Sequence, residues 1–372
     1  MNWLSKSFGY AGALSACLSL ALVVESPQAR AADMPGPVKA VKVKQALADL
    51  GKRLFFDPRL SGDGELACAS CHQPEKGFAD GMELSDAYPG TLGFRNTPTL
   101  INSAQRAVWF HDGRMGTSLN DVTREMLTET YLMNMDMRLM QERLKQDPVY
   151  VKMFKAAGMS EPSNGGVRNA IPEYLKTLVS KNAPYDTGKM SASAKRGQDI
   201  FMGKGECIAC HSGDRFTDDK PHNTGVPEND KIFEEPLRHI TFVTFGKFMG
   251  IGNYMNLRRD VGGHVVTNYA DKTDYGQFVT PTLRELKYTA PYMHNGTLRS
   301  LQEVVTFYNE GGGDDVNKDS HLKPLFLSER EQADLVSFLE ALSGDPLTSK
   351  TYVADEIDTD YVPIKSWRKT KN

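Results

Sequence analysis

Apolar residues recur at helical spacing along much of the chain. Leu47, Leu50 and Leu54 form one such face, which ends at Asp57-Pro58, a pair expected to terminate a helix. The pattern therefore predicts a mainly helical protein. Further helix starts or apolar helical faces are expected at Ser118 with Asp121, at Met133, Met137, Met140 and Leu144, at Ser300-Leu301-Gln302-Glu303, and at Ser328-Glu329-Arg330-Glu331.

Strand signals are few. Residues 240–245 could form one short strand, because the run is rich in β-branched and aromatic side chains. Residues 158–167 and 311–320 gather Gly, Pro and Asn, which predicts loops. The expected fold class is mainly α with few short strands.

The first residues have the features of an export signal. Lys6 gives a basic start, residues 11–24 are apolar and uncharged, and Ala29-Arg30-Ala31 offers a small-x-small cleavage pattern. The apolar run is shorter than the roughly 20 residues that a membrane-spanning helix needs. We therefore expect residues 1–31 to be a signal peptide, with a periplasmic mature protein and no stable membrane insertion.

The formal net charge is −3, and removal of the signal would make the mature chain slightly more acidic. This mild acidity gives no support for nucleic-acid binding and only weak support for a basic protein partner.

Cysteine placement narrows the chemistry further. Of the five cysteines, Cys17 lies in the signal, and the other four fall in Cys68-Ala69-Ser70-Cys71-His72 and Cys207-Ile208-Ala209-Cys210-His211. A disulfide, a redox dithiol or half of a zinc site are the alternatives at each pair. A redox dithiol does not need a His at the next position, and a zinc site of four Cys would leave both His unexplained. The pattern C-x-x-C-H indicates covalent haem c at both places.

The spacing of the two motifs predicts two tandem units. A chain of 372 residues suits two modest domains. We expect cytochrome-c-like haem domains at residues 32–165 and 166–346, followed by a C-terminal tail at 347–372.

The number of Met and His residues does not identify the sixth ligands of the haem irons, because Met occurs 16 times and several His lie outside the two motifs. The His residues outside the motifs are His111, His222, His239, His264, His294 and His321.

Several further blocks surround the two motifs and span roughly residues 45–345. The blocks are Leu54-Phe55-Phe56-Asp57-Pro58-Arg59-Leu60-Ser61, Arg95-Asn96-Thr97-Pro98-Thr99-Leu100, His111-Asp112-Gly113-Arg114, His222-Asn223-Thr224-Gly225, Pro281-Thr282-Leu283-Arg284 and Thr289-Ala290-Pro291-Tyr292-Met293-His294-Asn295-Gly296. In content and order these blocks resemble the bacterial di-haem cytochrome c peroxidases and their MauG-type relatives.

The resemblance implies a division of labour between the haems. The haem on His72 would react with hydrogen peroxide, and the haem on His211 would be six-coordinate and store or pass electrons. The family also implies a calcium ion, with ligands that map to the Asn96 side chain and to the carbonyls of Thr289 and Pro291. Oxygen donors suit a hard cation, although Asn96 alone could equally be a turn residue.

The sequence departs from the simple peroxidases at the second haem. Their sixth ligand is a Met seven residues after the Leu that corresponds to Leu301, and here Tyr308 occupies that position, as in MauG-type enzymes. An inward-pointing Tyr could also be a core residue. As a ligand, a phenolate oxygen would favour the oxidised states of the iron, whereas a thioether favours the ferrous state.

Two further departures concern the first haem. The simple peroxidases carry a His between the first motif and the Arg-Asn block that blocks the iron at rest, and residues 73–94 contain no His. The family's distal Glu, which moves the peroxide proton, is also missing, since a straight alignment places Tyr131 or Leu132 there. Glu129 is the nearest carboxylate and our candidate, with Glu125 second; either could be a solvated helix charge.

The family's Trp between the haems is replaced by His111, and Trp109 is the candidate for a shifted aromatic bridge. We expect a peroxide-reducing enzyme that shares oxidising equivalents between two haems and oxidises a partner protein or donor, as MauG does. The alternatives are peroxide detoxification with a small cytochrome or cupredoxin donor, and a di-haem electron-transfer cytochrome without enzymatic activity.

Overall fold

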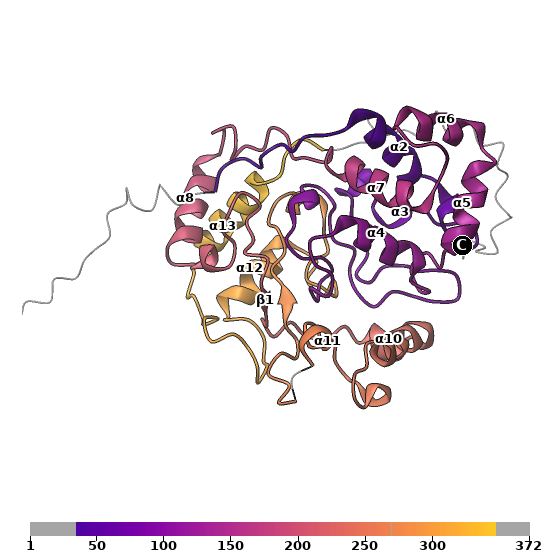
Figure 1. Ribbon diagram of the computed structural model, residues 1–372. Coiled ribbons are helices and arrows are strands. Elements are labelled where there is room, and N and C mark those ends of the chain that lie inside the picture. The colour runs from indigo at the N-terminus through magenta and orange to yellow at the C-terminus, as the bar shows by residue number, and fades with distance from the viewer. Residues whose placement is uncertain (1–34, 269, 347–372) are drawn as a thin grey trace, which may run out of the picture. The chain divides into compact units, whose positions relative to one another are not determined.

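The computed structural model describes residues 35–268 and 270–346 (Figure 1). The expected signal peptide and C-terminal tail lie outside these residues. Within them, no helix is long and apolar enough to cross a membrane. The helices are α2 (Gln45–Phe55), α3 (Cys68–Cys71), α4 (Leu119–Thr128), α5 (Met137–Lys145), α6 (Pro148–Ala156), α7 (Asn164–Leu175), α8 (Ala192–Met202), α9 (Lys231–Glu234), α10 (Pro236–Phe248), α11 (His264–Thr267), α12 (Leu301–Asn309) and α13 (Glu329–Ala341).

The prediction of a mainly helical protein with few short strands is confirmed. The strands of the described residues, β1 (Pro221–His222) and β2 (Phe278–Val279), form one antiparallel pair in which His222 lies opposite Phe278.

Each C-x-x-C-H motif follows a helix that packs closely against a later helix (Figure 1). Before the first motif, α2 packs on α7, and before the second, α8 packs on α13. Both contacts are close because a glycine stands at them. A Cβ on Gly51 would lie 1.9 Å from the Ala170 carbonyl oxygen, and one on Gly197 would lie 1.9 Å from the Asp334 carbonyl oxygen. The domain division at residue 165 stays a prediction, although α7 packs on α2.

The glycine contact gives a stability prediction. We expect Gly51→Ala to lower the thermal unfolding midpoint, because the methyl group must push the α7 backbone away, at a cost of about 1–3 kcal/mol. Gly165→Ala is the matched control, since a Cβ there meets nothing within 4 Å in α7. The control should be neutral or stabilising by about 0.4–1 kcal/mol. A Gly51→Ala midpoint at or above that of the wild type would contradict this account of the α2–α7 contact.

Local capping signals located several helix starts correctly. Ser118, Ser300 and Ser328 each accept a hydrogen bond from the backbone N–H three residues later, at the starts of α4, α12 and α13. The prediction that Met133, Met137, Met140 and Leu144 form one apolar face of a single helix is wrong. Residue 133 lies in the loop between α4 and α5, because Asp136 begins a new helix by accepting from the N–H groups of the next turn.

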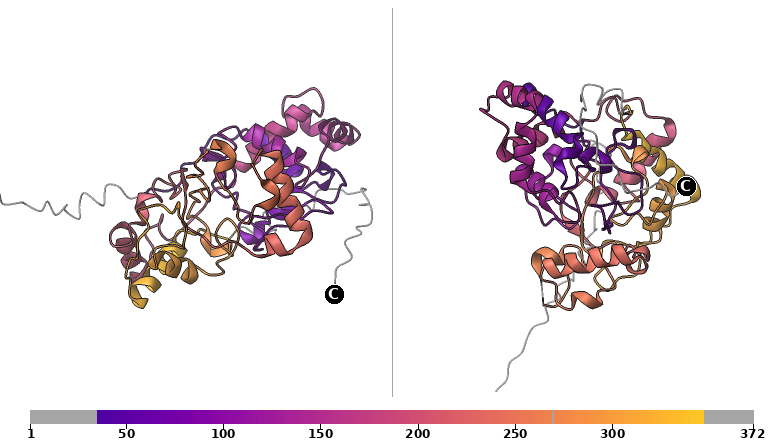
Figure 2. Two further views of the ribbon diagram at one scale, coloured as in Figure 1. Left: turned by 90° about the horizontal axis from the view of Figure 1, so that it is seen from below. Right: turned by 90° about the vertical axis from the view of Figure 1, so that its right-hand side faces the viewer.

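The expected strand at residues 240–245 is also wrong, since the segment lies inside α10. Pro236 occupies the first turn, and the helix buries Phe242 and Phe245 against Phe94. Tertiary burial at helical spacing therefore outweighs the strand preference of this run. The outer face of α10 is at the surface, where Phe248 is 73% exposed (Figure 2).

Candidate active site

The first motif forms the short helix α3 and holds its histidine in one orientation. The His72 backbone N–H donates to the Cys68 carbonyl at 2.9 Å. The ring Nδ1 faces the Phe78 carbonyl at 2.9 Å, so Nδ1 carries the proton and donates. The other ring nitrogen, Nε2, is then the unprotonated one, as an iron ligand requires.

The second motif repeats this geometry without sharing any residue with the first. The His211 N–H donates to the Cys207 carbonyl at 2.9 Å, and its Nδ1 donates to the Phe216 carbonyl at 2.9 Å. Burial lowers the pKa of His72 and of His211, so both rings are held neutral. Both are therefore prepared to coordinate a metal through Nε2.

The thiols do not fit the alternative uses of a C-x-x-C pair. All four are free in the structure, so neither pair forms a disulfide. Burial raises the pKa of Cys68 and of Cys207 to about 12. A redox dithiol reacts as a thiolate, which is disfavoured at such a pKa. Covalent attachment to haem vinyl groups removes the thiol proton and fits this environment.

A large cavity opens beside the first motif. It measures about 1470 Å³ with the space open to solvent included, and its lining is mostly apolar. The apolar wall is built by Phe55, Leu100, Leu119, Val122, Leu127, Ile171 and Leu175. A cavity of this kind, with two cysteines and a neutral His at its edge, fits a haem.

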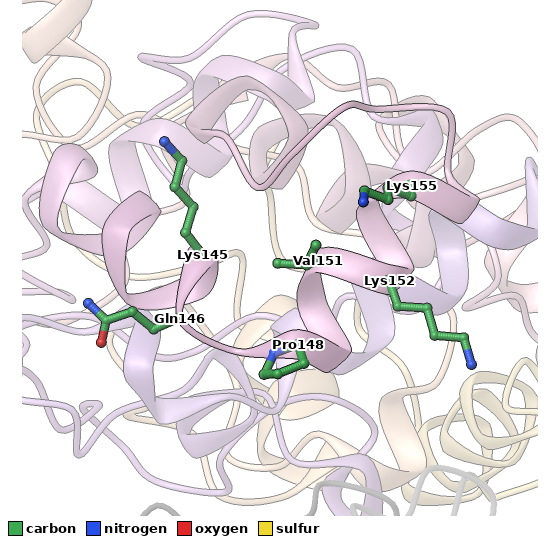
Figure 3. Close-up of a pocket in the computed structure, with 6 residues that line it drawn as sticks. All are labelled: Lys145, Gln146, Pro148, Val151, Lys152 and Lys155. Carbon is green, nitrogen blue, oxygen red and sulfur yellow. The ribbon is translucent and has the colours of Figure 1, made fainter.

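A second hollow lies on the surface between the end of α5 and α6 (Figure 3). It is lined by Lys145, Gln146, Pro148, Val151, Lys152 and Lys155, and it contains none of the predicted site residues. We assign it no role in the chemistry.

The structure does not place the candidate carboxylates on the wall of the cavity. Neither Glu125 nor Glu129 is among its lining residues, and Glu129 Oε1 accepts from the backbone N–H of Thr130 at 2.8 Å. Tyr131 and Leu132, which the alignment placed at the missing Glu, do line the cavity. Burial raises the pKa of Tyr131 to about 12, so its phenol keeps its proton. The role of Glu129 stays a prediction.

Trp109 and His111 both line the cavity. Trp109 is 5% exposed, and its indole Nε1 has no hydrogen-bond partner within residues 35–268 and 270–346. His111 Nε2 donates to the Asn96 carbonyl at 2.8 Å, and burial lowers the His111 pKa to about 4, so this ring is neutral as well.

The loop at residues 73–94 contributes Ser85, Asp86, Ala87, Gly93 and Phe94 to the cavity lining. None of these side chains is a strong iron ligand in the way that a His is. The open iron expected from the missing His stays a prediction.

Tyr308, on α12, lies close to the second motif. Burial raises its pKa to about 12, the cysteines of the motif add to the shift, and the Thr224 side chain hydrogen bonds to it. The Tyr308 phenol therefore lies within electrostatic range of Cys207 and Cys210. Its ligation of iron stays a prediction.

Sequence reasoning gave no role to His222, which also lies at the second motif. Its Nδ1 faces Asp319 at 2.8 Å and its Nε2 faces Asp218 at 3.0 Å. Hydrogen bonds with the Cys210 thiol, Asp319 and Asp218 raise the His222 pKa. Its membership of the His-Asn-Thr-Gly block was the signal that could have found it.

The two motif regions are linked through the β1–β2 pair. Val279 N–H donates to the His111 carbonyl at 2.8 Å, while β1 carries His222 beside Cys210. Next to Val279, the Phe278 ring stacks on His294, with ring centroids 3.6 Å apart. The β1–β2 pair therefore contacts both motif regions.

The expected calcium ligands are placed as follows. Asn96 Nδ2 donates to the Met82 carbonyl at 2.7 Å, which leaves the side-chain oxygen available. Thr289 lies against the first motif's loop, where a Cβ on Gly77 would be 3.1 Å from its methyl group. Pro291 follows the cis Ala290–Pro291 peptide bond. The calcium site stays a prediction.

Comparison with known proteins agrees with this geometry. The family model of di-haem cytochrome c peroxidase matches residues 45–194. The chain is 47% identical to cytochrome-c peroxidase IdrP2 of Denitromonas iodatirespirans over 90% of this chain and 92% of that protein. It is 37% identical to the methylamine utilization protein MauG of Methylorubrum extorquens over 85% of this chain and 83% of that protein.

The chain belongs to the di-haem cytochrome c peroxidase and MauG family. It is a peroxidase-type oxidoreductase whose cofactors are two haem c groups. A MauG-like protein associated with microbial copper homeostasis shares the fold, with a TM-score of 0.72 and 27% identity over 91% of this chain and 100% of that one. The di-haem peroxidase BthA of Burkholderia thailandensis, at 21% identity, shares the fold with a TM-score of 0.67 over 85% of this chain and 92% of that one.

Proposed function

We propose that this family member is an exported, periplasmic enzyme of the MauG type. Cys68, Cys71 and His72 would hold the haem that supplies the peroxide-reducing iron, and Tyr308 would provide an oxygen ligand for the iron of the haem held at the second motif. The observation that carries the proposal is the position of Tyr308 beside Cys207 and Cys210. The haem irons supply the redox centres for peroxide reduction.

The protein groups orient and insulate this chemistry. Hydrogen bonds to backbone carbonyls fix His72 and His211 in one tautomer. The apolar cavity wall limits the access of water and strengthens the electrostatic interactions inside. Glu129 takes up or delivers protons at the distal side, and its charge acts on the Tyr131 phenol, which lines the cavity. The Asn96 side chain and the carbonyls of Thr289 and Pro291 would hold calcium.

The electron source is a partner protein. In the MauG-like form of the proposal, the oxidising equivalents are used on a residue of that partner or on a donor. The 47% identity to a protein named cytochrome-c peroxidase favours a second candidate, in which a small cytochrome or cupredoxin supplies electrons for peroxide removal. An electron-transfer cytochrome that is not an enzyme would need both irons saturated by strong ligands.

The reactivity of the resting protein tests the proposal. Because residues 73–94 contain no His, we expect the fully ferric protein to contain a high-spin haem and to react with peroxide without prior reduction. Stopped-flow mixing of ferric protein with peroxide, followed by absorbance, measures this directly. A protein with two low-spin haems that responds only after one haem is reduced would show that the first iron is blocked.

A further inference from the structure

The wall of the first cavity carries three arginines, of which two are neutralised by carboxylates. Arg95 Nη1 lies 2.5 Å from Asp112, and its Nε lies 2.6 Å from Asp260. Arg114 Nη1 lies 2.7 Å from the same Asp112. These two cations are therefore part of a closed ionic network within the protein.

The third arginine, Arg106, has no such partner. Among the described residues, its guanidinium makes no hydrogen bond or ion pair, and burial lowers its pKa to about 10. The acid that acts on it is Asp219, which is already engaged by Arg215 and by the Ala107 backbone N–H. A half-buried guanidinium without an ion-pair partner in contact costs desolvation free energy, so an anion in the cavity would stabilise it.

An aromatic ring lies next to this cation. The Arg106 guanidinium carbon is 5.4 Å from the centroid of the Trp109 ring, and both residues line the cavity. The Trp109 indole nitrogen is inaccessible to solvent, so the ring packs on the guanidinium and does not itself bind a ligand. The guanidinium offers several N–H donors, which suit a carboxylate because it accepts several hydrogen bonds at once.

We infer that Arg106, packed on the Trp109 ring, forms a carboxylate-binding site in the wall of the first cavity, and that a propionate of the haem held at Cys68 and Cys71 occupies it. This inference rests on the proposed function, because it requires a haem at the first motif. Arg106 also lies within electrostatic range of Arg215 and Asp219, in the loop that follows the second motif.

The charge of Arg106 should set the reduction potential of the first haem. A nearby cation stabilises the ferrous state, which carries one positive charge fewer than the ferric state. Removal of the cation should therefore lower the potential. It should also leave the propionate buried and unpaired, so that the propionate binds a proton at higher pH and the potential becomes pH-dependent near neutrality.

Spectroelectrochemical titration of both haems across neutral pH tests this. Arg106→Leu is expected to shift the first haem to lower potential and to make that potential fall with rising pH. Arg106→Lys keeps the charge and should leave the potential of the first haem near that of the wild type. Trp109→Phe changes the ring that packs on the guanidinium and should give a smaller shift in the same direction as Arg106→Leu. Arg124→Leu is the matched control, since Arg124 is exposed on α4 and does not line the cavity. An Arg106→Leu protein whose potentials match those of this control overturns the inference.

Two further measurements separate the remaining outcomes. If free anions occupy the site, added acetate will shift the spectrum of the wild type and not that of Arg106→Leu, which overturns the propionate assignment; an unresponsive wild type supports it. Intact-protein mass counts the attached haems. A wild type without the first haem overturns this inference together with the proposed function, whereas two attached haems with unchanged potentials in Arg106→Leu overturn the inference alone.

Discussion

Replacement of Tyr308 by Met is expected to raise the reduction potential of the second haem on the order of 0.1 V or more, a fraction of the roughly 0.8 V over which axial ligands set haem potentials. A phenolate stabilises ferric iron through its negative charge, whereas a neutral thioether favours the ferrous state. The spectral change that peroxide produces should also become shorter-lived. Peroxide binding at the first haem should persist, since its cavity is untouched by the change.

The controls for Tyr308→Met follow from α12. Phe307→Met introduces the same side chain at the neighbouring position, where the ring centroids of Phe307 and Tyr308 are 5.2 Å apart. This variant should leave the potential of the second haem near that of the wild type. Tyr308→Phe keeps the packing and removes only the oxygen, so a sixth ligand should be lost and a high-spin spectrum should appear. If Tyr308 is only a core residue, none of the three variants will move the potential, and the MauG-type proposal fails while the family assignment stands.

The features that could be predicted from the sequence are those set by neighbouring residues. The helix starts at Ser118, Ser300 and Ser328 depend on a side chain and an N–H three residues apart, which the sequence displays directly. The C-x-x-C-H motifs are equally local. In each motif the His ring Nδ1 donates a hydrogen bond to the backbone carbonyl five or six residues later, across a turn that begins at the motif.

The features that were missed depend on contacts between distant segments. Residues 240–245 have a local strand preference, but the burial of Phe242 and Phe245 against Phe94 selects a helix. Arg106 could not be distinguished from the other arginines, because its lack of a partner depends on where Asp219 lies. The distal acid was uncertain for the same reason, since the loop after α4 decides which side chain reaches the cavity.

The distal proton transfer gives the second large effect. We expect Glu129→Gln to slow the reaction of ferric protein with peroxide by roughly 10²- to 10⁴-fold, the usual contribution of a general acid–base group. Because Tyr131 lines the cavity and the Glu129 charge acts on it, we expect Tyr131→Phe to slow the reaction as well. Gln and Phe keep the shape of the side chains that they replace, so haem attachment should be retained.

Glu125→Gln is the matched control, because Glu125 belongs to the same helix end and does not line the cavity. It should change the rate little. Stopped-flow rate constants over a range of peroxide concentrations separate slowed proton transfer from weakened binding. A slow Glu125→Gln protein would move the role to that residue. A slow Tyr131→Phe protein with a normal Glu129→Gln rate would make the phenol the proton donor and Glu129 a solvated charge, because a relay that begins at Glu129 cannot survive the loss of its carboxylate.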